Sequence, residues 1–398
     1  MSLNRGRPLM AIPGPSIIPD RVLSAMHRPS PNIYEGALLE LTDSLVPDLK
    51  AVARTQHNVV MYIANGHGAW EAAISNTLAP GDKALVLGTG RFGPGWGEVA
   101  TRMGVEIETL DFGMHGDADP NALEDRLRAD TNGEIKAVLV VLADTATSVL
   151  NDIAALRKAI DAAGHDALFM VDAVASLGCD VFEMDEWGVD VTVAGCQKGL
   201  MTPAGMSFVY YNDKADRARE SVRATWYWDW RTRTNPSIFY MYFGGTPPTQ
   251  HLYGLREALD MLVHEEGVEA AWARHRVFAE AIWAAIEAMG LSHNISDPEK
   301  RSLAVSAICA PKGAGRQIRE WCEHEAGLTL GIPLGFGTPG DLESDARFRI
   351  GHMGHQNIVT TMGIIGAIEA AMEAHGAAHT KGAIAAASKV FAKATAGN

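Results

Sequence analysis

The sequence predicts an α/β fold with a mostly parallel central sheet and a second, smaller domain. From residue 58 onward, short β-branched apolar segments alternate with helical stretches, which is typical of βαβ units. After residue 211 this alternation stops, and long helical segments lead into a shorter set of strands and helices. With 398 residues, the chain is long enough for more than one packing unit, at about 150 residues per domain.

The larger unit is expected to contain a sheet of seven strands with helices on both faces. Its strands are predicted at 59–63, 84–87, 106–110, 137–142, 168–171, 189–193 and 207–211. Helices are predicted at 69–78, 94–103, 120–128 and 153–163. Either Asn151 or Asp152 is the expected N-cap of the last helix, because both side chains accept hydrogen bonds from a first helical turn.

Residues 225–248 are rich in aromatic residues, Pro and Gly, and are predicted to be irregular. Helical periodicity is strong over 252–263 and 268–289, a length suited to linking two domains. The smaller unit is then predicted to have strands at 304–308, 328–332 and 347–350, and helices at 315–325 and 356–374. The Ala-rich tail from residue 376 is predicted to form a peripheral helix.

Composition and charge limit the class of protein. Lys and Arg number 34 and Asp and Glu 48, so the net charge of −14 argues against a nucleic acid or an anionic membrane as the main partner. No secretory signal and no uncharged apolar stretch of membrane-spanning length is readable. The four cysteines show neither a C-x-x-C motif nor a Cys/His spacing for a metal, so we expect a cytoplasmic protein without a metal site.

Two residues at predicted strand ends suggest the chemistry. In an open parallel sheet, ligands bind beyond the carboxyl ends of the strands, where Asp172 and Lys198 both lie. Taken singly, a helix-capping Asp and a surface Lys are the simpler explanations. Together, a desolvated lysine that forms a Schiff base and a buried acid that holds a pyridinium nitrogen suit pyridoxal phosphate. Gly66-His67-Gly68 would supply backbone N–H groups for its phosphate.

A second hypothesis is an NAD-dependent oxidoreductase. Gly88-x-Gly90-x-x-Gly93 follows a predicted strand, and Asp111 ends the next one, as in a dinucleotide-binding motif. However, Pro94 comes where the helix of that motif should already be under way, and the hypothesis leaves Lys198 and Asp172 unexplained. A lyase or desulfurase of the same fold usually needs a reactive cysteine on a mobile loop, and no cysteine is predicted in one.

Five motifs, in order along nearly the whole chain, carry a resemblance to a known family. The sequence resembles the class V, fold-type I pyridoxal-phosphate aminotransferases, and within them the alanine–glyoxylate, serine–glyoxylate and serine–pyruvate group. The motifs are Pro13-Gly14-Pro15-Ser16, Gly66-His67-Gly68-Ala69-Trp70-Glu71-Ala72-Ala73, Val171-Asp172-Ala173-Val174-Ala175-Ser176-Leu177-Gly178, Gly195-Cys196-Gln197-Lys198-Gly199 and Arg349-Ile350-Gly351-His352-Met353-Gly354.

The resemblance implies a role for each candidate residue. Lys198 would be the Schiff-base lysine and Asp172 the partner of the pyridine nitrogen. Arg349 would bind the substrate carboxylate. The remaining cofactor contacts would be Val174 and Phe92 on the two ring faces, Gly66, His67 and Gln197 at the phosphate, Thr145 near the ring hydroxyl, and Thr246 at the phosphate of the partner subunit in a homodimer.

The implied function is transfer of an amino group from a small amino acid, serine or alanine, to glyoxylate or pyruvate. Residues 1–20 would join the small domain, 21–265 would form the large cofactor-binding domain, and 266–398 the small domain. Where relatives often carry Arg-Ser-Pro near the partner's site, this chain has Tyr34 and Glu35, so Tyr34 is a candidate substrate contact and the donor stays open. This departure, and the Asp144-Thr145 pair, also resemble pyridoxamine–pyruvate aminotransferase, which is the alternative function.

Overall fold

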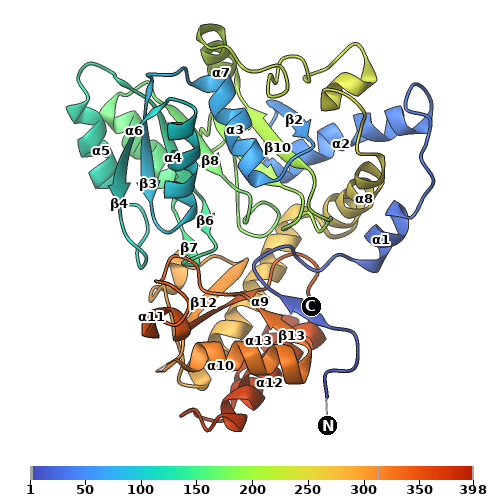
Figure 1. Cartoon of the computed structure of the whole chain (residues 1–398), viewed down its shortest axis with the longest axis vertical. Coiled ribbons are helices and arrows are strands. Elements are labelled where there is room, and N and C mark those ends of the chain that lie inside the picture. The colour runs from blue at the N-terminus through green and yellow to red at the C-terminus, as the bar shows by residue number, and fades with distance from the viewer. Residues whose placement is uncertain (1–2, 312, 397–398) are drawn as a thin grey trace.

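The computed structural model describes residues 3–311 and 313–396. Figure 1 shows two parts, with the large sheet and its helices above, and the C-terminal strands and helices below. The N-terminal segment crosses from the lower part to the upper part. Among the described residues, no helix combines the length and the apolar character needed to cross a bilayer.

The predicted seven-stranded sheet is present, which confirms the fold class. Its strands are β2 (Asn58–Tyr62), β3 (Lys83–Gly88), β4 (Glu106–Asp111), β5 (Ile135–Val141), β8 (Leu168–Asp172), β9 (Val191–Gly195) and β10 (Ser207–Tyr211). Their order in space is β2-β10-β9-β8-β5-β3-β4. Only β10 runs against its neighbours, so the other six strands end at the same edge of the sheet.

The sixth strand begins two residues later than predicted, at Val191 instead of residue 189. The reason is Asp190, whose carboxylate accepts a hydrogen bond from the backbone N–H of Phe169 at 2.8 Å. This contact keeps Asp190 in the turn that leads into β9.

The four predicted helices are also present, but two of them begin earlier. They are α3 (Gly66–Thr77), α4 (Phe92–Arg102), α5 (Pro120–Ala129) and α6 (Ile153–Ala163). The predicted starts were residues 69 and 94, whereas α3 begins at Gly66 and α4 at Phe92. Gly66, Gly68 and Pro94 fit these first turns because the first N–H groups of a helix need no intrahelical acceptor. The predicted N-cap of α6 is Asp152, which accepts from Ala155 N at 2.9 Å.

Several elements, most of them short, were not predicted. They are β1 (Leu9–Ala11), α1 (Asp20–Met26), α2 (Ala37–Ala53), α7 (Asp213–Ala218), the hairpin of β6 (Ala143–Asp144) with β7 (Val149–Leu150), and β11 (Ser292–His293). Residues 225–248 are irregular, as predicted, apart from the 3₁₀ helix η2 (Phe239–Phe243). The helix predicted at 252–263 is α8 (Thr249–Leu259), which continues into the π-helical η3 (Asp260–Glu266).

The lower part is built on a small antiparallel sheet. Its strands β12 (Val305–Cys309) and β14 (Arg347–Gly351) pair with each other, and β11 pairs with β12. The predicted strand at 328–332 is β13 (Leu328–Leu330), which pairs in parallel with β1 near the N-terminus. The helices are α9 (Val268–Ala288), α10 (Ala314–Trp321), α11 (Leu342–Asp345), α12 (Ile358–Ala374) and α13 (Ala383–Thr395), of which α13 is the predicted tail helix.

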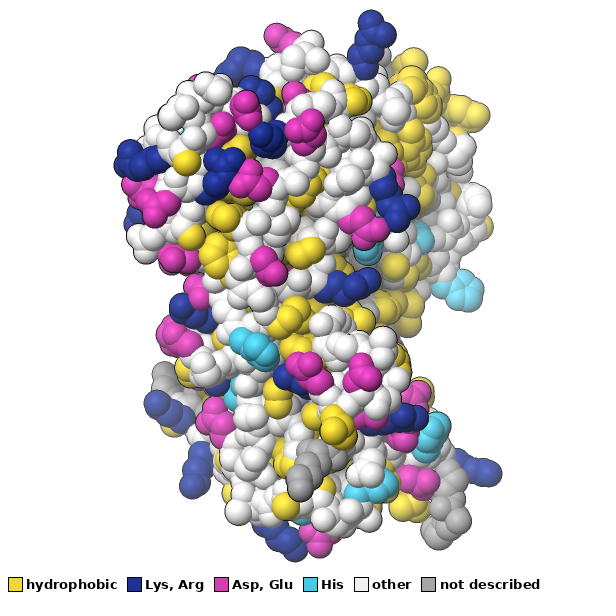
Figure 2. Space-filling model, turned by 60° about the vertical axis from the view of Figure 1, so that its left-hand side comes forward, with side chains coloured by type: hydrophobic (Ala, Val, Ile, Leu, Met, Phe, Trp, Pro, Cys, Tyr) yellow, Lys and Arg dark blue, Asp and Glu magenta, His cyan; other side chains and the backbone are white. Residues whose placement is uncertain are grey.

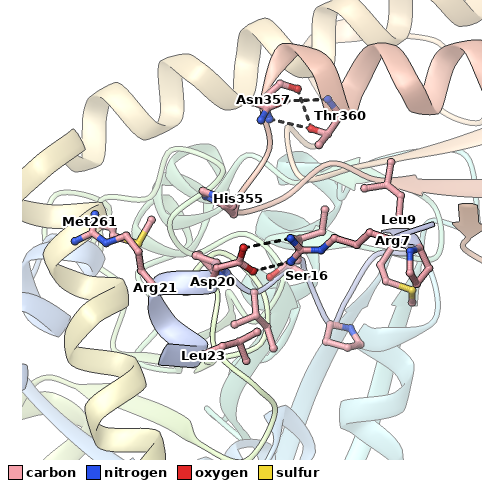
Figure 3. A pocket seen from close by; sticks show the side chains of 16 residues that line it. Arg7, Leu9, Ser16, Asp20, Arg21, Leu23, Met261, His355, Asn357 and Thr360 are labelled. Carbon is pink, nitrogen blue, oxygen red and sulfur yellow. Dashed lines mark hydrogen bonds and ion pairs between the residues drawn. The ribbon is translucent and has the colours of Figure 1, made fainter. Parts of the chain in front are cut away.

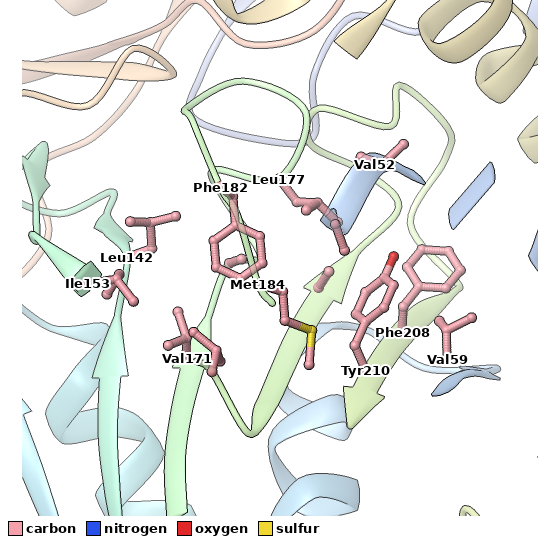
Figure 4. Packing of buried hydrophobic residues seen from close by; sticks show 14 of the residues in the cluster. Val52, Val59, Leu142, Ile153, Val171, Leu177, Phe182, Met184, Phe208 and Tyr210 are labelled. Carbon is pink, nitrogen blue, oxygen red and sulfur yellow. The ribbon is translucent and has the colours of Figure 1, made fainter. Parts of the chain in front are cut away.

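Both faces of the large sheet are buried. Val171, Phe208 and Tyr210 point into one core, shown in Figure 4, whereas the alternate residues Met170 and Val209 point into the core on the other face. A separate core fills the lower part. The first turns of α9 pack in the upper core and its later turns in the lower one, so this helix links the two parts. The predicted domain limits at residues 20 and 265 stay predictions.

Candidate active site

A cavity of about 230 Å³ lies at the shared edge where the parallel strands of the large sheet end. Most of the residues that the sequence singled out for a cofactor line it together: Gly66, His67, Phe92, Thr145, Asp172, Val174, Gln197 and Lys198. They come from different parts of the chain, and the sheet order brings them together because β2, β3, β5, β8 and β9 point the same way.

Asp172 is the last residue of β8 and is buried. One carboxylate oxygen, Oδ1, accepts from the backbone N–H of Val174 at 2.7 Å, and the other, Oδ2, accepts from the indole N–H of Trp70 at 2.7 Å. Burial raises the pKa of Asp172 to about 6, although these two hydrogen bonds favour the ionised form and oppose the shift. A buried carboxylate with paired oxygens is suited to hold a cationic partner.

Lys198 lies in the turn after β9 and faces the same cavity. Burial, and then the positive charge of Arg349, lower its pKa from 10.5 to about 8. Its ammonium donates a hydrogen bond to the Pro13 carbonyl, and the Ser16 hydroxyl donates to the Lys198 carbonyl at 2.7 Å. A Cβ at Gly14 would overlap the Lys198 side chain, so the Pro-Gly-Pro-Ser motif packs directly against the lysine.

The N-terminus of α3 forms one end of the cavity. The first N–H groups of a helix have no intrahelical acceptors, so Gly66 and His67 present free donors there. Asn65 caps the helix by accepting from Gly68 N at 3.3 Å. Gln197 also lines this cavity, and the NH₂ group of its side-chain amide is a hydrogen-bond donor that an anion can use. Together these groups make an end of the cavity suited to an anion.

The cavity also has aliphatic and aromatic lining residues. Val174 is an aliphatic one, and a Cβ on Gly66 would come within 2.9 Å of its side chain. Phe92 is an aromatic one, at the start of α4. Its backbone N–H donates to Asp144 Oδ2 at 2.8 Å, and Gly90 lets this carboxylate approach, since a Cβ there would lie 2.5 Å from Asp144.

Arg349 joins the lower part of the molecule to this site. It is buried on β14, where Nε donates to the Ile332 carbonyl at 2.6 Å and Nη1 to the Thr145 carbonyl at 2.8 Å. Burial lowers its pKa to about 10, and the negative charge of Asp144 opposes this shift. Among the described residues, Nη2 has no hydrogen-bond partner, which leaves this donor for a ligand.

Two predicted residues lie away from the cavity. Tyr34 is 77% exposed, and Thr246 is also exposed. Neither lines the cavity, so the single chain does not bring them to the other candidates. Their predicted roles involve a partner subunit and stay predictions, as do the catalytic and binding roles of the residues inside the cavity.

A larger cavity, about 670 Å³, contains none of the predicted site residues. It lies beside the N-terminal segment and the start of α12 (Figure 3). Arg7 there pairs with Asp20, and Arg21 pairs with Glu257 and Glu265. Because both arginines are already paired with carboxylates, this cavity offers a ligand fewer unpaired charged groups than the smaller one.

Sequence reasoning missed Trp70 and Asp144 as members of the site. Trp70 belongs to one of the recognised motifs and lies one turn beyond Gly66 on α3, where i, i+4 residues share a helix face. That spacing could have placed it beside the anion-binding end, had the helix been predicted to start at residue 66. The sequence did mark the Asp144-Thr145 pair, but not the contact of Asp144 with the Phe92 backbone, which depends on the unpredicted hairpin of β6 and β7.

Comparisons with known proteins agree with this geometry. Residues 41–331 match the family model described as aminotransferase class-V. The serine–glyoxylate aminotransferase of Methylorubrum extorquens is 41% identical over 394 residues, which cover 96% of each chain. Two solved structures superpose closely: ureidoglycine–glyoxylate aminotransferase from Bacillus subtilis (TM-score 0.86, 27% identity, 97% of this chain and 98% of that one) and pyridoxamine–pyruvate aminotransferase from Mesorhizobium loti (0.85, 26%, 99% and 100%).

Proposed function

Because this chain belongs to the class V aminotransferase family, we propose that it transfers an amino group from serine or alanine to glyoxylate or pyruvate. The family, the enzyme class and the pyridoxal-phosphate cofactor expected from the sequence are confirmed by this membership. Membership of this family also excludes the alternative function as an NAD-dependent oxidoreductase. The observation that carries the proposal is the meeting of a lysine with a lowered pKa and a buried aspartate in one cavity.

The residues present fit pyridoxal phosphate. Gly66 and His67 at the N-terminus of α3 would hold its phosphate, and Val174 and Phe92 would enclose its ring. Gly66 packs directly against Val174, since a Cβ at this position would come within 2.9 Å of the Val174 side chain. Thr145, whose hydroxyl forms no hydrogen bond among the described residues, would reach the ring hydroxyl.

Each charged residue then has a defined task. When bound, pyridoxal phosphate supplies an aldehyde that joins amines covalently and a protonated ring that withdraws electrons. Asp172 keeps the proton on the ring nitrogen. Lys198 would hold the aldehyde and would take the proton from the substrate Cα as general base. Arg349 binds the substrate carboxylate through its free Nη2 and orients that carbon.

Two experiments test this function. Borohydride reduction of the reconstituted enzyme, followed by peptide mass mapping, should place the label on Lys198. A label on another residue, or no label, would overturn the assignment. Lys198→Ala should lower the rate of amino transfer by more than the roughly 10²–10⁴-fold expected for an ordinary acid–base residue, because the variant also lacks the amine that anchors the cofactor covalently.

The substrates need a direct assay. The likeness in sequence to a serine–glyoxylate aminotransferase supports serine as donor and glyoxylate as acceptor. The likeness in structure to a pyridoxamine–pyruvate aminotransferase keeps that reaction as the second candidate. A panel of donors and acceptors, followed in half-reactions by cofactor absorbance, separates them. Turnover of free pyridoxamine in preference to amino acids would favour the second candidate.

We also propose a homodimer with sites built from both chains. Exposed apolar side chains surround the edge strand β2, among them Ile63, Trp226 and Ile238, and Figure 2 shows hydrophobic side chains gathered along the right-hand edge of the upper part. Thr246 follows η2, which packs beside β2, so docking there would carry it to the partner. Light scattering should report a dimer, and Ile238→Asp should yield monomers with reduced activity.

The cytoplasm is the proposed compartment. All four cysteines are free, and three of them are buried, which suits a reducing environment. Fractionation of the native source with antibodies against the chain would test this assignment.

A further inference from the structure

We propose that Trp70 is a positioning residue, whose indole N–H orients the Asp172 carboxylate and keeps it ionised for the cofactor's pyridine nitrogen. This proposal rests on the proposed function, since it concerns how Asp172 serves the cofactor. Nothing in the family match or the relatives' names assigns Trp70 a role.

The contact itself is short and buried. Trp70 is 3% exposed on α3, and its Nε1 donates to Asp172 Oδ2 at 2.7 Å. The backbone N–H of Val174 donates to the other oxygen at the same distance. With one donor on each oxygen, the carboxylate plane is fixed against rotation. The Val174 bond comes from the main chain, so Trp70 is the side chain on which this orientation depends.

Ring contacts hold the indole in place. Trp70 stacks on Trp96 at 6.1 Å between centroids and meets His67 edge-on at 4.5 Å and Phe92 at 6.4 Å. His67 and Phe92 also line the cavity. The same indole therefore touches the anion-binding end, the aromatic lining residue Phe92 and the acid.

The charge of Asp172 depends on these donors. Burial favours its neutral form, and so does the nearby negative charge of Asp144, whereas the Trp70 and Val174 hydrogen bonds favour the carboxylate. A hydrogen bond to a buried charged group is among the stronger single interactions in a protein. Without the indole donor, Asp172 would keep its own proton to higher pH and would pair less well with a protonated pyridine.

The chain offers a matched control for the test. Trp96 lies in the same aromatic cluster and is fully buried, but its indole N–H has no partner among the described residues. Trp70→Phe and Trp96→Phe therefore make the same chemical change, and only the first removes a donor from Asp172.

The experiment measures cofactor affinity of the full-length apoenzymes by equilibrium dialysis, over a range of pH. Each protein is titrated with pyridoxal phosphate and with a deaza analogue in which carbon replaces the pyridine nitrogen. We expect Trp70→Phe to bind pyridoxal phosphate at least about tenfold more weakly, with its affinity profile displaced to higher pH. Its affinity for the deaza analogue should match that of the parent protein, and Trp96→Phe should resemble the parent with both compounds.

Other results would overturn the proposal. If the affinity of Trp70→Phe fell by the same factor for pyridoxal phosphate and for the deaza analogue, the indole would only shape the cavity. If it bound pyridoxal phosphate as the parent does, the hydrogen bond would not matter. Thermal unfolding of the two apoenzyme variants shows whether both are folded, and Trp70→His, which restores a ring N–H, should recover part of the lost affinity. Failure of the parent protein itself to bind pyridoxal phosphate would instead refute the proposed function.

Discussion

The lowered pKa of Lys198 makes a prediction that needs no cofactor. With a pKa of about 8, roughly one-tenth of the Lys198 side chains are neutral at about pH 7, compared with about one in three thousand at the ordinary value of 10.5. The structure thus raises the reactive fraction by about 300-fold. Lys198 should therefore be acylated by trace acetic anhydride with a midpoint near pH 8, whereas the exposed Lys158 serves as internal reference.

The cause of the shift can be tested with single substitutions. The charge of Arg349 lowers the pKa of Lys198 and the charge of Asp172 raises it, so Arg349→Met should move the midpoint up and Asp172→Asn should move it down. Arg347→Met, two residues away on the same strand and paired with Glu343, is the control and should leave the midpoint unchanged. A midpoint near 10.5 in the parent protein, or opposite shifts in the variants, would refute the reasoning.

Three further predictions concern stability and specificity. The pKa of Asp172 is raised from 3.8 to about 6, so between these pH values the folded apoenzyme binds more protons than the unfolded chain and loses stability as pH rises. In denaturant titrations, Asp172→Asn should reduce this pH-dependent loss of unfolding free energy by up to about 3 kcal/mol. An unchanged dependence of the unfolding free energy on pH would contradict the prediction. Gly14→Ala, at a φ of +101°, would place a Cβ against the Lys198 side chain, so it should lower both the melting temperature and the activity. These losses should exceed those of Gly36→Ala, because Gly36 has a similar φ of +94° but open space around it. Equal losses in the two variants would mean that backbone strain alone explains the effect. Glu35→Arg should raise kcat/KM for dicarboxylic donors relative to serine if Glu35 faces the partner's site, and an unchanged ratio would remove Glu35 from the argument.

The sheet and most of the cavity could be predicted because both follow from local patterns. Each strand is a short apolar run, and polar or glycine residues mark where it ends. Parallel strands then bring these ends together whatever their distance in sequence, which is how Asp172 and Lys198 meet. The family resemblance added the expected roles of Arg349 and Thr145, which the strand pattern alone does not supply.

The missed features depend on contacts between distant segments. Strand β1 has only three residues and exists because β13 pairs with it. Asp144 becomes part of the site because a two-residue strand turns back on β7, and because Gly90 leaves room for its carboxylate. The helix predicted to begin at Pro94 begins at Phe92 instead, so Pro94 lies within the first turn, where a proline removes no intrahelical hydrogen bond.

In the proposed mechanism, the placement of Arg349 couples substrate binding to the basicity of Lys198. Before a substrate arrives, the guanidinium repels the ammonium form, lowers the pKa of Lys198 and so raises the fraction of lysine that is neutral. A carboxylate bound at the free Nη2 would offset that positive charge, since opposite charges within a few ångströms favour each other's ionised form. The pKa of Lys198 should then rise toward its ordinary value at the step where the amine accepts a proton from the substrate. One buried arginine thus keeps the lysine reactive toward an aldehyde first, and makes it a stronger base once the substrate is held.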